Sequence, residues 1–501
     1  MCLNFIIMMK MKRIYVTVLV LGALVTACEL PDNVNPKAPT EVPASTLLTQ
    51  AETDLIYTVD DISMNVNISR FLCQYASQTN YTQESRYDFE DRSIPDTYFA
   101  WVYYVLRDLQ EIETLISDLS GSESFNRNRD NKLAIVDILG VYIMHTLVDY
   151  MGNVPYTEAL QSAENKTPAY DEAAAIYNDL MERLRADIAT LQTGINDGSW
   201  GAEDVIGGGD VTLWKKAASS LLLRLGMRLA DVNASAAQSA LSDALAAGVF
   251  EEGDVWQLVW TNNTPHVNPI YNRHIVDNRN DYAPALTIIS KMEEMNDPRM
   301  PLYFTQVDTS GSGDFAYVGL EYGRVDAANY PAISHWSDQM FDPTFPSVLG
   351  DYVEVQFLLA EAAARGFTTP MTAEEHYDEA ITASIVFWGG EDQEANPYLA
   401  QADVAYDQAR WKELIGTQKW IALYNRGNEG YASWRIFDWP VLSPPMEMTQ
   451  QDIPLRWPYP YDEVSLNNAN YTAAASAIGG DDVRTQVFWD ETPNSASPDP
   501  Q

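Results

Sequence analysis

Aromatic side chains with a polar edge are common in this 501-residue chain, which has 28 Tyr and 13 Trp against 15 Phe. Such rings can stack on the apolar C–H face of a sugar, while neighbouring amide and charged groups meet its hydroxyls. The rings outside the predicted helices are candidates for ligand contact, because no apolar stripe accounts for them. The candidate ligand-binding residues are Tyr81, Tyr87, Trp260, Tyr271, Asn272, Tyr322 and Trp336.

Trp336 is the principal candidate. It follows His335 in a stretch, Gly311 to Gly350, that has little apolar periodicity. We therefore expect an exposed ring whose replacement by alanine removes most ligand affinity and leaves the melting temperature nearly unchanged. Trp420 lies in a helical pattern, and we expect it in the core together with Trp214 and Trp434. Trp101 begins a pattern that continues through Tyr104, so we also assign it to packing.

Residue patterns typical of catalysis are scarce. The five histidines show no metal-ligand spacing, and Gly311-Ser312-Gly313 lacks the flanking residues of a nucleophile elbow. Gly207-Gly208-Gly209 precedes a predicted helix without the Lys-Ser/Thr of a phosphate loop, so we interpret it as a flexible connector. We predict no catalytic residue, no metal and no cofactor. A glycoside hydrolase remains an alternative, since 71 Asp and Glu make some suitable carboxyl pair inevitable, but for that reason no chosen pair is evidence.

The net charge is −40. A surface this acidic repels phosphate backbones, which excludes nucleic acid as a partner.

The N-terminus has the pattern of an export signal. Met11-Lys12-Arg13 precedes an apolar run from Ile14 to Ala27, too short for a membrane span of about 20 residues. The run ends in Leu-Val-Thr-Ala before Cys28 and resembles a bacterial lipobox, which implies cleavage there and lipidation of Cys28. An ordinary signal peptide cut near Ala27 is the alternative, and the start codon is open among Met1, Met9 and Met11.

The predicted organisation follows from this signal. Residues 1–27 form the lipoprotein signal peptide, and 28–44 form the acylated cysteine and a flexible tether with four prolines. Residues 45–501 form a single helical domain with loop insertions near 251–281 and 305–349. Cys73 is the one thiol left after acylation, and we expect it to be buried and unbridged.

Apolar stripes at helical spacing predict an all-α fold. They occur near 98–118, 129–151, 170–192, 212–231, 235–247, 282–295, 350–366, 372–388 and 403–425. Short turns join 212–231 to 235–247 and 350–366 to 372–388, as in helical repeats, and Gly248 and Gly366 stand at expected helix ends. The segment from Pro440 onward is predicted to be largely non-helical.

Several segments match, in order, the signatures of one family. They are Asp149–Tyr156 (DYMGNVPY), Pro168–Asp171 with Ile176-Tyr177, Trp214–Lys216 (WKK), Leu223–Leu229 (LRLGMRL), Asn296–Arg299 (NDPR), Tyr352–Ala362 (YVEVQFLLAEA), Gln418–Leu423 (QKWIAL), Trp434-Arg435, and Pro454–Pro460 (PLRWPYP) with Glu463 and Asn467. Through them the chain resembles the SusD/RagB family, in its SusD-like branch, of outer-membrane nutrient-binding lipoproteins of Bacteroidetes. One departure is Leu455-Arg456, where the family often has paired arginines.

The resemblance implies a SusD-like α-α superhelix of TPR-like helix pairs, with irregular ligand-binding loops on one face. It also implies a lipid-anchored protein of the outer membrane that faces the cell exterior. Such a protein captures a glycan and delivers it to a SusC-like TonB-dependent transporter, and it is not an enzyme. A second alternative is a helical-repeat scaffold without a ligand of its own. The identity of the glycan, the aromatic residues of the platform and the presence of a structural calcium stay open.

Most family-motif residues have a structural role in this interpretation. Arg224, Arg228, Arg299 and Arg456 are expected to tie helix ends and loops through carboxylates or carbonyls, because the planar guanidinium makes bidentate contacts.

Overall fold

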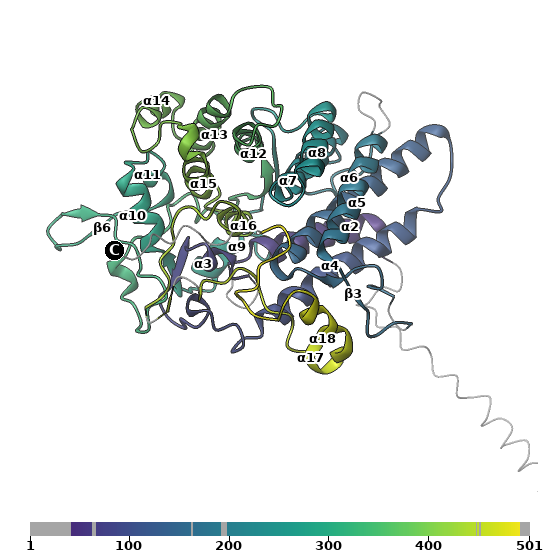
Figure 1. Ribbon diagram of the computed structural model, residues 1–501, viewed down its shortest axis with the longest axis horizontal. Helices are drawn as coiled ribbons and strands as arrows, with labels where there is room; N and C mark the ends of the chain where they lie inside the picture. The colour runs from purple at the N-terminus through teal and green to yellow at the C-terminus, as the bar shows by residue number, and fades with distance from the viewer. Residues whose placement is uncertain are drawn as a thin grey trace, which may run out of the picture. The chain divides into compact units, whose positions relative to one another are not determined.

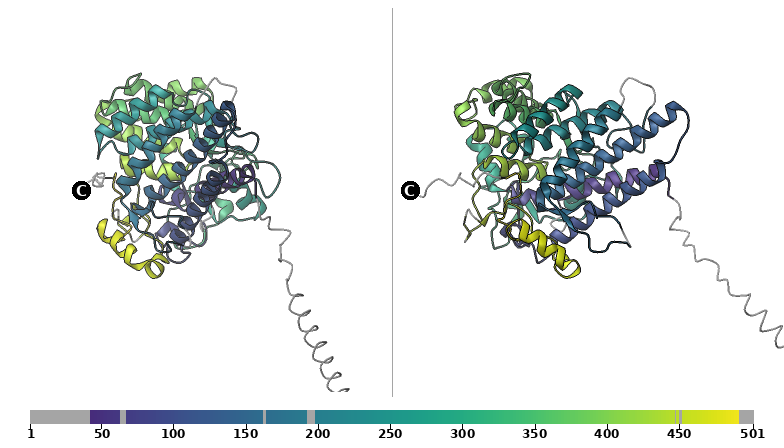
Figure 2. Two further views of the ribbon diagram at one scale, coloured as in Figure 1. Left: turned by 90° about the vertical axis from the view of Figure 1, so that its right-hand side faces the viewer. Right: turned by 45° about the vertical axis from the view of Figure 1, so that its right-hand side comes forward.

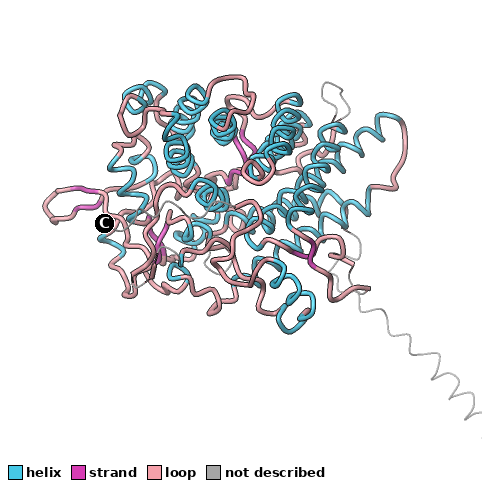
Figure 3. The backbone as a smooth tube through the Cα atoms, in the orientation of Figure 1, coloured by secondary structure: helices cyan, strands magenta, loops and turns pink. Residues whose placement is uncertain are grey.

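Helices form most of the computed structural model, and the strands are at most five residues long (Figure 3). The structure describes residues 42–62, 67–161, 164–191, 198–446, 448–449 and 452–490. The predicted signal peptide, Cys28 and most of the predicted tether lie outside these residues. The described elements all belong to one unit that begins at Ala44.

Eight helices form an array in which neighbours in sequence are neighbours in space. They are α2 (Ala44–Asp60), α4 (Ile94–Ile116), α5 (Glu123–Met151), α6 (Ala173–Thr190), α7 (Val211–Arg228), α8 (Ala234–Ala247), α12 (Tyr352–Ala364) and α13 (Ala373–Phe387). Helix α4 packs on α2 and α5, α6 on α5 and α7, α7 on α8 and α12, and α12 on α13 (Figures 1 and 2). The two helix pairs predicted from short turns, α7 with α8 and α12 with α13, are confirmed.

Local sequence signals define where these helices begin and end. The Asp210 side chain accepts hydrogen bonds from the first-turn amides of α7, and Thr372 forms a capping box with Glu375 at the start of α13. Gly248 and Gly366 follow α8 and α12 with φ of 95° and 86°, a conformation that favours glycine. The helix-ending role predicted for both glycines is therefore confirmed.

Helix α5 is the central helix of the array. Its residues from Ala134 to Met151 are nearly all buried, so this half of the helix is covered on every side. Among the described residues it is the one helix long and apolar enough to cross a membrane, but most of that apolar stretch is buried inside the protein. We therefore interpret α5 as a core helix.

A second group of helices packs against the array. Helix α15 (Trp411–Ala422) lies on α12 and α13, and α16 (Gly427–Phe437) lies on α15 and α3 (Ser69–Leu72). The shorter helices and turns of the described chain are η1 (Glu84–Arg86), α9 (Pro269–Tyr271), η2 (Asn272–Val276), α10 (Leu286–Glu294), α11 (Met300–Tyr303), η3 (Tyr330–Ala332), η4 (Asp392–Glu394), α14 (Ala395–Leu399), η5 (Gln408–Arg410), α17 (Glu463–Leu466) and α18 (Asn468–Ala477).

The strands pair two by two, always antiparallel. The pairs are β1 (Ala76–Gln78) with β5 (Tyr282–Pro284), β2 (Val154–Pro155) with β3 (Tyr170–Asp171), β4 (Val255–Leu258) with β8 (Ser347–Asp351), and β6 (Val307–Asp308) with β7 (Phe315–Ala316). Each pair forms a separate two-stranded sheet, so the strands fix loops rather than build a sheet core.

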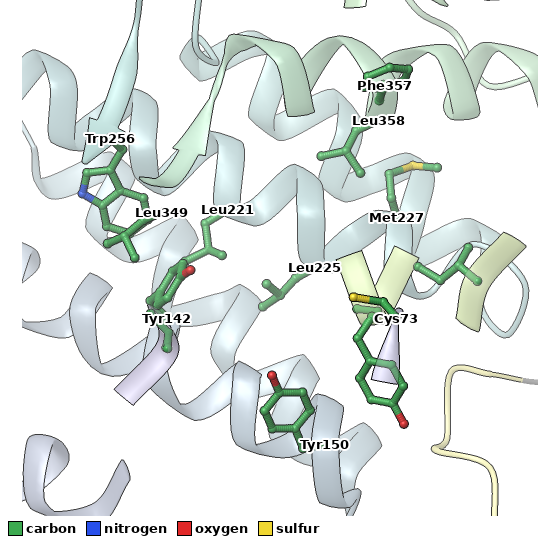
Figure 4. Close-up of a cluster of buried hydrophobic side chains, with 14 of the residues drawn as sticks. Cys73, Tyr142, Tyr150, Leu221, Leu225, Met227, Trp256, Leu349, Phe357 and Leu358 are labelled. Carbon is green, nitrogen blue, oxygen red and sulfur yellow. The ribbon is translucent and has the colours of Figure 1, made fainter. Parts of the chain in front are cut away.

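One large hydrophobic cluster joins the array to the second helix group. In Figure 4, Tyr142 of α5 meets Trp256 of β4 and Leu349 of β8, and the Tyr142 and Trp256 rings stand edge to face at 5.2 Å. Trp420 is fully buried, and its indole N–H donates to the Cys73 carbonyl at 2.9 Å. The core assignment of Trp420, and likewise of Trp214 and Trp434, is confirmed.

A buried ion network connects the three helices α7, α12 and α16. Arg224 of α7 contacts both carboxylate oxygens of Glu354 in α12, at 2.6 and 2.7 Å, and Arg426 donates to the same carboxylate at 2.8 Å. Arg228 donates to Glu429 of α16 at 2.6 Å. Burial acts to raise the pKa of Glu354, but the charges of Arg224 and Arg426 hold it below its ordinary value.

Two further arginines bind loops in the same way. Arg299 pairs with Asp297, with 2.9 Å between Nε and Oδ1, and Arg456 donates to the Met151 carbonyl at 3.1 Å. The structural role predicted for the motif arginines is confirmed.

Several predicted boundaries and loops need correction. Residues 282–284, predicted as helix, form strand β5, because they pair with β1 before α10 begins. The helix predicted from 403 begins at Trp411. The described segment after Pro440 is largely non-helical, as predicted, and contains the short helices α17 and α18.

The triple glycine is not a flexible connector. The Asp204 carboxylate accepts hydrogen bonds from the Gly207 and Gly209 amides, at 2.6 and 2.8 Å, and from the Trp214 indole N–H at 2.6 Å. This carboxylate organises the loop into a fixed turn at the start of α7.

Candidate functional site

Three segments far apart in sequence meet where β1 pairs with β5. Beyond the strand ends, the Thr79 amide donates to the Asp281 carbonyl at 2.7 Å, and the Ala328 amide donates to the Thr79 carbonyl at 2.8 Å. The segments 79–92, 271–281 and 321–335 therefore form one group of loops, which we call the loop platform. Of the seven predicted ligand residues, all but Trp260 and Trp336 come from these segments, and Trp336 follows directly.

Tyr81 is the most exposed aromatic side chain of the loop platform. Its side chain is 58% exposed, and the guanidinium carbon of Arg92 lies 5.5 Å from the ring centroid on one face. Its φ of 53° is uncommon for a tyrosine, and such strain persists only where the surroundings hold it. The geometry leaves an aromatic surface at a fixed position, backed by a cation.

Buried polar contacts hold that position. The Gln78 amide donates to the Tyr81 carbonyl at 2.6 Å and to the Glu84 carboxylate at 2.7 Å, and it accepts from the Ser85 amide at 2.8 Å. Glu84 in turn pairs with Arg92. Burial raises the pKa of Glu84, against the opposing effect of its hydrogen bonds and of the Arg92 charge.

Tyr271 and Asn272 lie at the junction of α9 and η2, and both are half-buried. Asn268 caps this turn and connects it to the loop that contains Phe345, because its side-chain amide donates to the Phe345 carbonyl at 2.8 Å. Further along the turn, Ile275 is 50% exposed. The two predicted residues can therefore offer part of their surface to a ligand beside an exposed apolar side chain.

Trp336 does not have the open ring predicted for it. It is 3% exposed, and its indole N–H donates to the Tyr424 hydroxyl. The His274 ring stands against it edge to face at 4.8 Å, and its backbone pairs with Phe304. Backbone pairing, rather than a helical stripe, places the indole in the core, so Trp336 supports the loop platform from inside.

Trp260 and Tyr322 need the same correction. They are 4% and 8% exposed. Trp260 donates to the Ser347 hydroxyl at 2.8 Å and packs on Tyr57, which fixes it beside α2. Tyr322 packs against half-buried Tyr87 with ring centroids 6.4 Å apart. In the observed conformation neither Trp260 nor Tyr322 presents a ring face that could stack on a ligand.

A second aromatic surface, absent from the predicted ligand residues, lies along α4. We call it the α4 groove, a hollow of about 290 Å³ lined by Phe99, Tyr103, Tyr104, Arg107, Pro155, Pro168 and Glu463, among others. Tyr104 is 55% exposed, and the Arg107 guanidinium lies 5.3 Å from its ring centroid. The sequence pattern placed Tyr104 in a packing stripe that begins at Trp101, and for Tyr104 this was wrong: the buried stripe of α4 runs through Tyr98, Val102 and Val105, and residue 104 falls outside it.

Both surfaces combine an exposed tyrosine, an arginine beside its ring and polar neighbours at the surface. Such groups bind and orient a polyhydroxylated ligand, with the ring on its C–H face and the polar groups on its hydroxyls. Among the described residues, no three His, Cys, Asp or Glu side chains come together in a way that could hold a metal ion.

Comparisons with known proteins agree on one family. A family model described as "Starch-binding associating with outer membrane", SusD-like, matches residues 36–460. A solved chitin-binding protein is 26% identical, with a TM-score of 0.75, over 90% of this chain and all of the other. A SusD homolog from Bacteroides uniformis is 25% identical, with a TM-score of 0.75, over 89% of this chain and 99% of its own. A chitin-binding SusD homolog from Flavobacterium johnsoniae, 22% identical over 89% and 99% with a TM-score of 0.76, shares the fold. No curated protein sequence matches the chain.

Proposed function

The chain belongs to the SusD-like family, and from that premise we propose that it is a non-catalytic glycan-binding protein whose ligand stacks on Tyr81. The family description and the 26% identical chitin-binding structure support a glycan as the ligand class. Starch-type and chitin-type oligosaccharides are the first candidates.

The observation that carries this proposal is the arrangement around Tyr81. The Tyr81 ring is 58% exposed and lies against Arg92, and the Tyr81 backbone has a strained φ of 53°. Maintaining this arrangement is costly in a purely structural loop. Preorganisation of this kind reduces the entropy lost when a ligand binds. Half-buried Tyr271 and Asn272, from another segment of the same loop platform, would supply further contacts.

The cellular setting of the proposal follows the family and the N-terminal pattern. Cys28 would be acylated and would hold the protein on the outer face of the outer membrane, since the family associates with that membrane. A SusC-like TonB-dependent transporter would receive the glycan. A flexible tether from residue 28 to 44 would let the anchored domain reach the transporter and deliver the glycan to it.

Calorimetric titration with α-1,4-linked glucose and β-1,4-linked N-acetylglucosamine oligosaccharides tests the proposal. We expect Tyr81→Ala to weaken binding roughly tenfold or more, because a single stacking ring can dominate a small interface. Its unfolding free energy should change by less than about 0.5 kcal/mol, as for other surface substitutions.

Tyr104→Ala is the matched control, because it removes an equally exposed tyrosine that also stacks on an arginine, in the α4 groove. If only this variant lost glycan affinity, the glycan-binding site would be assigned to the α4 groove instead of the loop platform. If no oligosaccharide on a glycan array binds the unaltered protein, the ligand-free scaffold becomes the better interpretation. Release of reducing sugar would favour the glycosidase.

A further inference from the structure

A cavity of about 550 Å³ lies between α4, α5 and α6, on the far side of Ala159 and Leu160 from the α4 groove. Its wall contains four acidic side chains, Glu113, Asp130, Asp137 and Asp187, and one basic side chain, Arg183. Neither the family motifs nor the loop platform uses these residues. Its volume falls in the range of small-molecule sites.

Asp187 is the least compensated of the four carboxyls. Its side chain belongs to a residue that is 7% exposed, and no N–H or O–H group donates to its Oδ2 atom. Its side-chain hydrogen bond is to the Asp137 carboxyl. Arg183 compensates Asp187 only by its charge, because the guanidinium donates to Asp137, at 3.1 and 3.2 Å from Nε, and to the Tyr156 hydroxyl at 2.7 Å. Burial first, and then the neighbouring Asp137, raise the pKa of Asp187 to about 9.

The rest of the wall is mainly aliphatic. Leu106, Leu109, Leu133 and Met144 line it together with Gly140, which stands inside helix α5. A Cβ at residue 140 would lie 3.4 Å from Arg183 Nη2 and 3.9 Å from a Leu106 methyl group. Glycine inside a helix is less favourable than alanine. Here its missing side chain leaves room between the ion pair and the leucines.

We propose that this cavity binds a protonated primary amine, with the ammonium group at Asp187 and the carbon skeleton against the leucines. A buried carboxyl whose side-chain hydrogen-bond partner is another carboxyl, as Asp187 has in Asp137, requires a cationic hydrogen-bond donor to be stable in its charged form. The other charged groups facing Asp187, namely Asp137 with Arg183 and, toward the opening, Asp130 and Glu113, leave the cavity net negative. An aliphatic diamine and an amino sugar with a free amine share this chemistry.

Binding would displace one proton. Before binding, Asp187 is protonated at neutral pH; the ammonium keeps its three protons, and the carboxyl proton leaves to solvent as the ion pair forms. The proton count is therefore a signature that a purely apolar ligand would not give.

Calorimetry on the full chain at pH 7, repeated in two buffers of different ionisation enthalpy, tests the proposal. The probes are putrescine and glucosamine, with 1,4-butanediol and glucose as their uncharged counterparts. We expect one of the two amines to bind with release of close to one proton, and neither uncharged probe to bind in the cavity. Binding of putrescine would identify the ligand class as an aliphatic diamine, and binding of glucosamine would identify it as an amino sugar.

Asp187→Asn should abolish the proton release and weaken amine binding at least tenfold, and Asp130→Asn should weaken it less. Asp378→Asn is the matched control, because burial also raises the pKa of Asp378, to about 6, but on α13 away from this cavity. Tyr81→Ala should leave amine binding unchanged, which separates this site from the glycan site. Failure of both amines to bind, or equal binding by Asp187→Asn, would overturn the proposal.

Discussion

At the scale of single residues, Trp336 connects the loop platform to the helical core. Its ring contacts His274 of η2 on one side and donates to Tyr424 on the other. We expect Trp336→Ala to destabilise the protein by about 3–5 kcal/mol, as for other buried aromatic truncations. Denaturant unfolding measures this change. Glycan affinity per folded molecule should survive, and a variant of unchanged stability that no longer binds would restore Trp336 as a ligand residue.

His274 gives a pH dependence. Burial, and next the charge of His335, lower the pKa of His274 to about 3, from an ordinary value near 6.5. Below pH 6.5 the unfolded chain takes up a proton that the folded protein does not take up until about pH 3. Stability is therefore lost as pH falls through this window, by up to about 1.4 kcal/mol per pH unit.

His274→Phe should reduce that slope, because the ring keeps its aromatic neighbours Tyr282 and Phe341 without a titrating nitrogen. Unfolding free energies of both proteins at pH 7, 6, 5 and 4 provide the measurement. Parallel curves for the two proteins would contradict the assignment.

Residue type and local pattern predicted part of the candidate site. Tyr81, Tyr271 and Asn272 were predicted to contact a ligand because they lie outside the apolar stripes of the predicted helices. The structure leaves them at least partly accessible. Trp336 also lies outside every apolar stripe, but a backbone bridge to Phe304 and a hydrogen bond to Tyr424 hold it in the core. These partners lie 32 and 88 positions away, beyond the reach of any local pattern.

At the scale of elements, the turn before α7 uses positive-φ backbone conformations that favour glycine. Gly209 has φ of 75°, and a Cβ there would lie 1.8 Å from the Trp200 carbonyl oxygen. We expect Gly209→Ala to destabilise the protein by more than about 2 kcal/mol, because strain and a backbone clash combine. Thermal or denaturant unfolding measures the loss.

Gly208→Ala is the matched control for that turn. Gly208 has φ of 61°, but a Cβ would meet nothing within 4 Å. Only conformational strain remains, on the order of 1 kcal/mol. Equal losses in the two variants would show that the close approach to Trp200 does not govern the turn.

Helix positions were the most predictable feature of the fold. The stripes of α4 to α8 specify which side is buried, and caps such as Asp210 and Thr372 specify where a helix starts. The short strands β1, β4, β5 and β8 were not predictable, because they pair with segments distant in sequence, as β1 does with β5. The loop platform depends on that pairing, so its assembly could not be read from local pattern either.

At the scale of the whole molecule, we propose that residues before the described domain determine the location of the protein. If Cys28 carries two or more acyl chains, they hold the protein firmly on a membrane, where one chain holds only marginally. We expect Cys28→Ser to move the protein from the membrane fraction to the soluble fraction. Fractionation followed by a carbonate wash measures this. A variant that stays in the washed membrane would contradict the lipobox interpretation.

The ion network of Arg224, Arg228, Glu354 and Glu429 acts at the same scale, because it joins α7, α12 and α16 inside the core. Removing one member would leave charged partners buried, which costs about 3–5 kcal/mol. The helix array and the second helix group are therefore expected to unfold together.

The Cys73 thiol allows opening of the core to be measured by chemical modification. Its thiol is fully buried, and burial raises its pKa, so the folded protein presents no reactive thiolate. A chain that starts at residue 29 contains no other cysteine. The rate at which a thiol reagent modifies such a chain under native conditions then reports how often this part of the core opens. Comparing that rate with and without glycan would show whether ligand binding at the surface slows opening at the centre.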